Sequence, residues 1–522
     1  MGPDAAKYFK RIGIVGAGNM GTMMSFGFAE QGVDVSLWDI SGTNVNRALQ
    51  MAKDARKEEK TVIGKIDCFC DIHEFTESLN DSNPAVYIFS ITHGDPADSI
   101  LKMIKDDLRA GDIILDGGNE HYRNTERRQR ELEKKGVHWV GMGVSGGYQS
   151  ARRGPSMSPG GTKDAVEKVL PLLEKFAAKD RRNSKPCVAY IGPYGAGHYV
   201  KMVHNGIENG MLSTISEAWS MMHKSLGMPF DEISRVFERW NSKGELRSTF
   251  LVQIGSEICL KKKTPEGDQR GEGAGRFGFV LDDVLDKVVQ DVDNTEGTLY
   301  WTVSESAFRH VAAPTIATGH FIRVASGNRD QRLRVAEKLN IPGPHKANDV
   351  RDKEALLEDL QRAVYASFLC SFCQGLELIA RASKDEGWDI NLGTCIRIWR
   401  AGCIIQAEHI LDLFETVFSS SSGQSQPIMN MKLIDEISSD LHKNFQPLKK
   451  IVLKAMEWDN CVPSMSASLE YIKYEGGTML PTQFMEAEMD YFGAHAYDKP
   501  NVKNEDPGEP NKGAHHYEWK PA

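Results

Sequence analysis

Arg11-Ile-Gly-Ile-Val-Gly-Ala-Gly-Asn-Met-Gly21 is the segment that decides the fold. It reads as a short buried strand that runs directly into a Gly-x-Gly-x-x-Gly turn. A helix is expected from about Met20 to Gln31, with Gly32 as its C-cap. Such a turn lets the backbone approach a pyrophosphate, while the helix N-terminus supplies amide donors. The segment therefore predicts a dinucleotide-binding domain; the alternative is a glycine turn with a structural role only.

The second strand, expected over Val33–Asp39, ends in an acid. A carboxylate at this position can accept hydrogen bonds from both adenosine ribose hydroxyls but repels a 2′-phosphate. Ile40 and Ser41 follow it, and the nearest cation is Arg47. The sequence therefore favours NAD over NADP, unless Asp39 only forms the turn that follows the strand.

Strand and helix signals alternate through the first part of the chain. This alternation predicts an α/β, Rossmann-type domain with a doubly wound, mostly parallel sheet that binds ligands at the carboxyl ends of its strands. Two polar, glycine-rich loops, Asp116–Asn119 and Gly143–Gly147, follow such strands and suit the binding of carboxylates and hydroxyls. Further strands are expected at Val86–Ile91, Ile113–Leu115, Val137–Val140 and Cys187–Ile191.

Helical periodicity replaces the strand signals after Gly192-Pro193. We therefore expect three parts: an α/β domain at 1–193, a large all-helical domain at 194–490, and a C-terminal tail at 491–522 that is extended unless it docks. Cys370 and Cys373 form a C-x-x-C in the helical part without a second pair at metal-ligand spacing, so core packing is the better interpretation. The expected helices are Ala196–Leu226, Phe230–Trp240, Phe250–Leu260, Ala355–Ala382 and Thr394–Phe418.

The first of these helices concentrates chemically useful side chains on one side. At about 100° per residue, Lys201, His204, Asn205 and Glu208 fall within an arc of roughly 100°. One helix would then offer a proton acceptor and a proton donor to one small substrate. The alternative is a polar stripe that simply faces water.

Composition excludes several classes of protein. Of 522 residues, 40% are hydrophobic and 26% are charged, as in ordinary globular proteins of several domains. No uninterrupted apolar run reaches the ~18 residues that span a bilayer, and the start has no signal-peptide core, so a cytoplasmic location is expected. The nine cysteines are widely spread, which suits a reducing compartment. The net charge of −9 argues against a nucleic-acid-binding surface.

Six motifs, in order along nearly the whole chain, carry a family resemblance. They are Ile114–Tyr122, Gly141–Gly147, Gly154–Gly161, Gly197–Glu208, Trp399–Ile405 and Asp490–His495. The chain resembles the 6-phosphogluconate dehydrogenase family, the decarboxylating enzymes of the pentose phosphate pathway, within the β-hydroxyacid dehydrogenase superfamily. The helix motif and Asp490-Tyr-Phe-Gly-Ala-His495 are its most specific parts.

The resemblance implies roles for individual residues. Lys201 corresponds to the general base that takes the 3-hydroxyl proton, and Glu208 to the acid that protonates C1 of the enediol that remains after CO₂ leaves. His495 corresponds to a substrate contact supplied by the neighbouring subunit, which implies a homodimer, and no metal is required. The other implied substrate-binding residues are Asn119, Ser145, Gly146, Gly147, His204, Asn205, Thr298 and Arg323. The expected cofactor-binding residues are Gly16, Gly18, Asn19, Met20, Gly21, Asp39 and Asn119.

The sequence departs from the family pattern where the family holds the substrate phosphate. Glu296 stands in place of a phosphate-binding lysine, Met489 in place of an arginine, and Asn209 in place of a tyrosine. Near the cofactor, Thr92 replaces a lysine, and Asp39-Ile-Ser41 replaces Asn-Arg-Thr. These changes remove positive charge from the phosphate site and leave the acid-base pair in place.

Three functional hypotheses remain. The chain is an oxidative decarboxylase of 6-phosphogluconate whose lost cations are replaced by others, with Lys243, Arg247 and Arg276 as candidates. Alternatively, it is an NAD-dependent dehydrogenase of another aldonate or 3-hydroxy acid. The third hypothesis is a non-catalytic dinucleotide-binding paralogue, against which the retained Lys201 and Glu208 argue.

Overall fold

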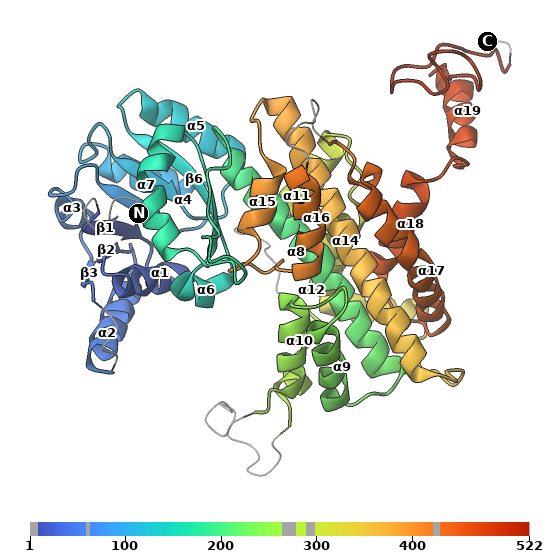
Figure 1. The fold of residues 1–522 in the computed structure, drawn as a ribbon, viewed down its shortest axis with the longest axis horizontal. Helices are drawn as coiled ribbons and strands as arrows, with labels where there is room; N and C mark the ends of the chain where they lie inside the picture. Colours follow the sequence, from blue (N-terminus) through green and yellow to red (C-terminus); the bar gives the residue numbers. More distant parts are fainter. Residues whose placement is uncertain (1–8, 59–62, 264–277, 289–297, 421–427, 521–522) are drawn as a thin grey trace. The chain divides into compact units, whose positions relative to one another are not determined.

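The computed structural model describes residues 9–58, 63–263, 278–288, 298–420 and 428–520 (Figure 1). The chain divides into two compact units, Met1–Leu469 and Glu470–Ala522. The first unit holds a sheet with its covering helices, followed by a large helical part. The sequence expectation of a Rossmann-type domain and an all-helical domain is confirmed in these elements, while the exact three-part division remains a prediction.

The sheet has seven strands in the order β3-β2-β1-β4-β5-β6-β7. The first six are parallel, and β7 pairs antiparallel with β6. From β1 to β3, successive strands are added toward one edge of the sheet, and from β4 onward toward the other edge. Ligands bind in such folds at this switch point between β1 and β4. The strands are β1 (Arg11–Val15), β2 (Asp34–Trp38), β3 (Ile66–Phe69), β4 (Val86–Phe89), β5 (Ile113–Asp116), β6 (His138–Ser145) and β7 (Ser156–Gly160).

Both faces of the sheet are buried. Successive residues of a strand point to opposite faces, so Ile14 joins one hydrophobic cluster with Phe28 and Phe176, while Val15 joins another with Phe75. This two-sided burial explains why the central strands read as continuous apolar runs. The surrounding helices are α1 (Asn19–Glu30), α2 (Gly42–Glu58), α3 (Ile72–Glu77), α4 (Asp95–Ile104), α5 (Tyr122–Glu133), α6 (Gly147–Arg153) and α7 (Lys163–Phe176).

The helical part is built around two long helices, α8 (Ala196–Ser220) and α14 (Lys353–Glu386), which pack against each other; α14 also packs against α17 (Asp435–Glu457) (Figure 1). The N-terminus of α8 lies directly on the sheet, because Gly197 has no side chain: a Cβ there would come within 2.2 Å of the Gly141 carbonyl. The remaining elements are η2 (Met221–Ser225), α9 (Phe230–Ser242), α10 (Phe250–Leu260), η4 (Val280–Asp283), α11 (Thr298–Phe308), α12 (Pro314–Gly327), α13 (Arg329–Leu339), α15 (Leu392–Ile398), α16 (Glu408–Ser420), η5 (Met431–Leu433), α17 (Asp435–Glu457), α18 (Pro463–Glu475) and α19 (Thr482–Gly493).

Two elements expected from sequence are wrong. Cys187–Ile191 runs beside β7 but is not a regular strand: Met157 N–H donates to the Cys187 carbonyl and Ile191 N–H to the Pro159 carbonyl, while Val188 forms only an isolated bridge with Met157. The helix expected at Thr394–Phe418 is broken between α15 and α16. There the Gly402 carbonyl instead accepts a hydrogen bond from Ser156 N–H at the edge of β7.

Within the described residues, one helix, α14, is long and apolar enough to cross a membrane. An 18-residue window of it has a mean hydropathy of 1.4 although a few polar residues interrupt it, so the search of the sequence for uninterrupted apolar runs did not reveal it. The whole window is buried inside the protein, where Cys370 and Cys373 are also fully buried, which agrees with the core-packing interpretation.

In the second unit, the chain folds back on α19. The buried Asp490 carboxylate accepts hydrogen bonds from Ala496 N–H (3.0 Å), Tyr517 N–H (3.1 Å) and Trp519 Nε1–H (2.8 Å), and His516 Nδ1 lies 2.9 Å from it. One acid therefore gathers four partners from the segment that the sequence suggested could be extended.

A buried acid in α8 predicts a pH-dependent stability. Glu217 accepts hydrogen bonds from the backbone N–H groups of Ser464 (2.8 Å) and Met465 (2.9 Å) at the start of α18, and burial raises its pKa from 4.5 to about 7. Because the folded-state pKa is raised, its contribution to stability is fully present below pH 4.5 and is lost as the pH rises through about 7. We expect the unfolding free energy of the wild type, relative to Glu217→Gln, to fall by roughly 2 to 3 kcal/mol between pH 5 and pH 8. Urea unfolding of both proteins at the two pH values checks this, and parallel pH profiles would contradict it.

Candidate active site

The polar face of α8 is not a water-facing stripe. Lys201 is 8% exposed and His204 only 1%, while Asn205 and Glu208 are partly exposed toward a cavity. Charged side chains are seldom buried to this degree without partners or a role. The structure thus brings together the four residues that helical spacing placed on one side.

Lys201 is held at its ammonium and along its stem. Its Nζ donates to Ser145 Oγ (3.2 Å) at the end of β6 and to Asn205 Oδ1 (2.9 Å) one turn along α8. Gly143 in β6 leaves room for the stem, since a Cβ at Gly143 would lie 2.3 Å from the Lys201 Cβ. The sheet and the helix therefore fix this amine together.

Asn205 connects Lys201 to the next elements. Its Oδ1 also lies 3.1 Å from His204 Nδ1, and its Nδ2 donates to Thr298 Oγ1 (3.0 Å) at the start of α11. Burial and the nearby Lys201 charge hold the pKa of His204 well below its ordinary value, so the ring is neutral and Nδ1 is assigned as the donor. His204 Nε2 is then a buried acceptor with no partner among the described residues.

Glu208 has the environment of a proton donor. Burial raises the pKa of its carboxyl group, and the positive charges of Lys201 and Arg323 act in the opposite direction. A raised pKa keeps a carboxyl group protonated closer to neutral pH, which general acid catalysis requires. Its Oε2 lies 3.8 Å from His204 Nδ1.

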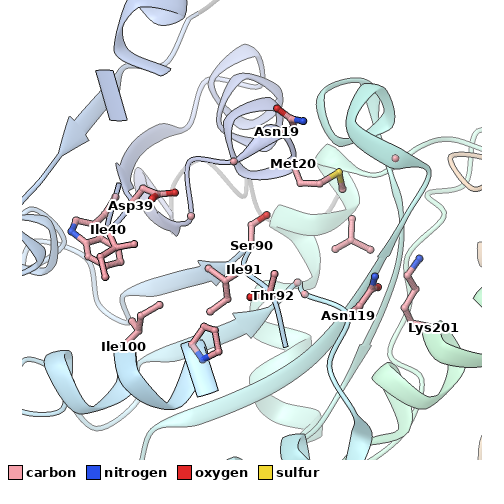
Figure 2. Close-up of a pocket in the computed structure, with 18 of the residues that line it drawn as sticks. Asn19, Met20, Asp39, Ile40, Ser90, Ile91, Thr92, Ile100, Asn119 and Lys201 are labelled. Atoms are coloured by element: carbon pink, nitrogen blue, oxygen red, sulfur yellow. The ribbon is translucent and has the colours of Figure 1, made fainter. Parts of the chain in front are cut away.

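One cavity of about 1030 Å³ joins these residues to the glycine-rich turn. Figure 2 shows Asp39 and Ile40 at one side of this cavity, and Asn119 and Lys201 at the other. A space of this size and length can hold an extended dinucleotide and a small substrate end to end. Of the predicted site residues, the cavity is lined by Gly16, Gly18, Asn19, Met20, Asp39, Asn119, Gly146, Gly147, Lys201, Asn205 and Glu208.

The glycine turn has the expected tight geometry. Gly16 has φ 103°, and a Cβ there would lie 2.3 Å from the Ser90 carbonyl, while a Cβ on Gly21 would meet the Gly16 carbonyl. Gly18 faces open space and precedes α1 without a side-chain cap. Unsatisfied amides at a helix start suit a pyrophosphate, so the residues present fit a dinucleotide.

Asp39 lies beside this turn and is already hydrogen-bonded. Its carboxylate accepts from Ala17 N–H (2.7 Å) and Ser41 N–H (2.7 Å), and from Asn44 Nδ2 at 3.3 Å. Arg47, the nearest cation in sequence, donates to the Ala17 carbonyl at 3.3 Å. Ile40 is 85% exposed.

The other predicted residues are more scattered. Ser145, His204 and Thr298 contact the Lys201–Asn205 pair without lining the cavity, Gly21 lies inside the turn, and Arg323 in α12 acts on Glu208 through its charge. Asn209 Nδ2 donates back to the Asn205 carbonyl (3.2 Å). His495 and Met489 belong to the second unit, and Glu296 lies outside the described residues.

Comparison with known proteins identifies the family. The NAD binding domain of 6-phosphogluconate dehydrogenase matches residues 11–192, and the C-terminal domain of the same enzyme matches residues 197–519. The chain belongs to the 6-phosphogluconate dehydrogenase family. Membership predicted from the sequence motifs is therefore confirmed.

Individual relatives match nearly end to end. The decarboxylating 6-phosphogluconate dehydrogenase of Emericella nidulans is 59% identical, with 96% of this chain and 100% of the relative covered. The NADP⁺-dependent decarboxylating enzyme of Bacillus subtilis is 34% identical, with 98% and 99% covered. Among solved structures, that of Plasmodium falciparum 6-phosphogluconate dehydrogenase, studied with NADP⁺ and with 6-phosphogluconate, matches with a TM-score of 0.81 and 31% identity over 94% of this chain and 98% of that one.

Apart from Thr92, one part of the cavity wall was not predicted from the sequence. The segment after β4 and one side of α4 contribute Ser90, Ile91, Thr92, Asp95, Pro96, Ser99, Ile100 and Met103. A sequence signal existed in Gly94-Asp95-Pro96, where a proline at the first helical turn marks a helix start beside the sheet edge.

Proposed function

We propose that this protein oxidatively decarboxylates 6-phosphogluconate to ribulose 5-phosphate and CO₂ and reduces NAD(P). The observation that carries the proposal is the buried Lys201, held by Ser145 and Asn205 in the cavity that also contains the glycine turn and Glu208. A binding protein has no need for such an acid-base pair, so a non-catalytic role is disfavoured.

The chain's own groups account for the proton movements. A dinucleotide held by the glycine turn and Asp39 would supply the acceptor for the hydride from C3 of the substrate. Lys201, in its neutral form, takes the 3-hydroxyl proton, and its ammonium then polarises the new carbonyl so that C1 leaves as CO₂. Glu208 donates a proton to the carbon that CO₂ has left. His204 Nδ1 donates to Asn205 Oδ1, so the ring holds the amide that in turn positions the Lys201 ammonium.

We propose NAD as the preferred dinucleotide. Asp39 is fixed by three donors at the end of β2, where its negative charge opposes a 2′-phosphate. The neighbouring Ile40 offers no positive charge to offset this repulsion. The names of the Bacillus subtilis and Plasmodium falciparum relatives refer to NADP⁺, so this preference would be a difference from them.

Exchange of two residues tests this preference. Asp39→Ala combined with Ile40→Arg removes the repelling carboxylate and adds a cation, so the ratio of kcat/KM for NADP to that for NAD should rise at least tenfold. Steady-state rates with each dinucleotide give the ratio, and Arg47→Ala serves as a control for general disturbance of the turn. An unchanged ratio would mean that Asp39 does not face the ribose.

The residues at the family's phosphate-binding site are where this sequence departs from the family pattern. Thr298 and Arg323 remain, whereas Asn209 bonds to its own helix and Glu296 carries the opposite charge to a lysine. These observations favour, as a second candidate, an NAD-dependent dehydrogenase of another aldonate or 3-hydroxy acid.

A comparison of two sugar acids separates the candidates. If the proposal holds, kcat/KM for 6-phosphogluconate exceeds that for gluconate by at least tenfold, because a retained cation-phosphate contact contributes that much affinity. Equal values, or a preference for gluconate, would favour the second candidate.

The assembly is also part of the proposal. We propose a homodimer in which His495 of one subunit completes the substrate site of the other, and a cytoplasmic location. The family resemblance at Asp490–His495 supports the shared site. Mixing inactive Lys201→Met and His495→Ala proteins should restore activity if the site is shared, and failure to do so would contradict the assignment.

A further inference from the structure

A glycine peptide beside the cavity is held from both sides. Gly94 ends the segment Ser90–Gly94 that leads from β4 into α4, and it has φ 81°. Its N–H donates to Glu120 Oε2 (2.8 Å), and its carbonyl accepts from Arg128 NH2 (2.8 Å). Glu120 directly follows Asn119, which lines the cavity from the end of β5. The carboxylate thus links two neighbouring walls of one cavity.

Glu120 is saturated with donors although it is only 2% exposed. Its Oε2 also accepts from Arg128 NH1 (2.5 Å), and its Oε1 accepts from His121 N–H (2.7 Å) and Asn124 Nδ2 (2.9 Å). Arg128 is fully buried and pairs on its other side with Asp98 of α4, at 2.9 and 3.0 Å. The ion pair therefore ties α4, α5 and both cavity loops together.

We propose that Glu120, through Arg128 and the Gly94 peptide, is a positioning residue that holds the dinucleotide-contacting wall Ser90–Ile100 in register with Asn119. This inference rests on the proposed use of a dinucleotide. Two features suggest binding rather than stability alone. Two donors to Glu120, the N–H groups of Gly94 and His121, lie directly before α4 and α5 and next to residues that line the cavity, and the neighbouring Thr92 and Asp95 face the cavity.

Only a carboxylate satisfies this arrangement. Four donors converge on its two oxygens. A glutamine has one acceptor oxygen, and the N–H groups of its amide would face the N–H groups that donate to the second carboxylate oxygen. Glu120→Gln keeps the size but leaves at least one pair of buried donors unsatisfied, and the Gly94 peptide is then free to shift.

The test measures dinucleotide binding directly, by fluorescence titration of the full-length protein with NADH and NADPH. For the dinucleotide that the wild type binds more tightly, Glu120→Gln should raise Kd tenfold or more. At saturating dinucleotide, KM for 6-phosphogluconate should stay within threefold. Glu126→Gln is the matched control, because Glu126 lies in the same helix, is also buried and pairs with Arg123 and Arg130, but does not touch Gly94. Its Kd should stay within twofold of wild type.

Two results would overturn the inference. A dinucleotide Kd within twofold of wild type would remove the positioning role, and equal weakening of dinucleotide and sugar acid would reduce Glu120 to general support of the fold. If Glu120→Gln does not fold, Asp98→Asn can be used instead, because it weakens the ion pair on the other side of Arg128; it should raise the dinucleotide Kd about threefold. If the wild type does not turn over 6-phosphogluconate, the proposed function fails, and the titration still decides the role of Glu120.

Discussion

Lys201→Met is expected to lower kcat at least about a thousandfold and to leave dinucleotide affinity within about twofold of wild type. Methionine fills the space of the lysine stem beside Gly143 but cannot take a proton or polarise a carbonyl. The hydrogen bonds to Ser145 and Asn205 are lost, while Asp39 lies at the far side of the cavity (Figure 2). The variant should therefore bind the dinucleotide normally but fail to catalyse the reaction.

The measurement is single-turnover dinucleotide reduction together with NADH titration. Lys224→Met is the matched control, because Lys224 is exposed just beyond the end of the same helix and should change neither value. Residual turnover above about a tenth of wild type would exclude Lys201 as the base, and loss of dinucleotide binding would point to a wider structural defect.

Gly143→Ala is expected to lower kcat about a hundredfold or more without changing any titratable group. Its new Cβ would come within 2.3 Å of the Lys201 Cβ and 2.4 Å of Ser158 Oγ, both of which are packed between β6, β7 and α8. The lysine stem must move, and small displacements of a catalytic group have large effects on rate. The backbone at Gly143 does not have a positive φ, so the effect would come from the contact rather than from strain.

Steady-state kinetics and thermal unfolding check this prediction together. Gly42→Ala, at the start of α2, is the control, because its Cβ would meet nothing within 4 Å. A fall in kcat with an unchanged pH optimum is expected in Gly143→Ala. Near-normal activity would mean that β6 moves to accommodate the added methyl group and that the position of Lys201 is less constrained than the packing indicates.

Features that depend on local pattern were predictable from the sequence. The strand, glycine turn and helix at the N-terminus follow from short-range rules, and so does the common side of Lys201 and Glu208 on one helix. These rules predict which side chains share one face of a helix and which loops lie at the edge of the sheet. Motif matching then added the family, which the comparisons confirm.

Features that depend on distant contacts were not predictable. The break between α15 and α16 exists because Gly402 bonds to Ser156, far away in the chain, although the local periodicity continues through it. The Cys187–Ile191 segment is apolar because it is buried, which periodicity cannot distinguish from a strand. Likewise, Glu120 is one acid among many in the sequence, and only the folded chain brings its four donors together.

We infer that Lys201 and Glu208 together support oxidation and decarboxylation of one substrate. The most direct test incubates the purified protein with 6-phosphogluconate labelled at C1 and measures labelled CO₂ against reduced dinucleotide, with NAD and NADP in separate reactions. We expect one CO₂ for each dinucleotide reduced, with faster turnover on NAD. Reduction without CO₂ release, or no reduction despite measurable dinucleotide binding, would contradict it.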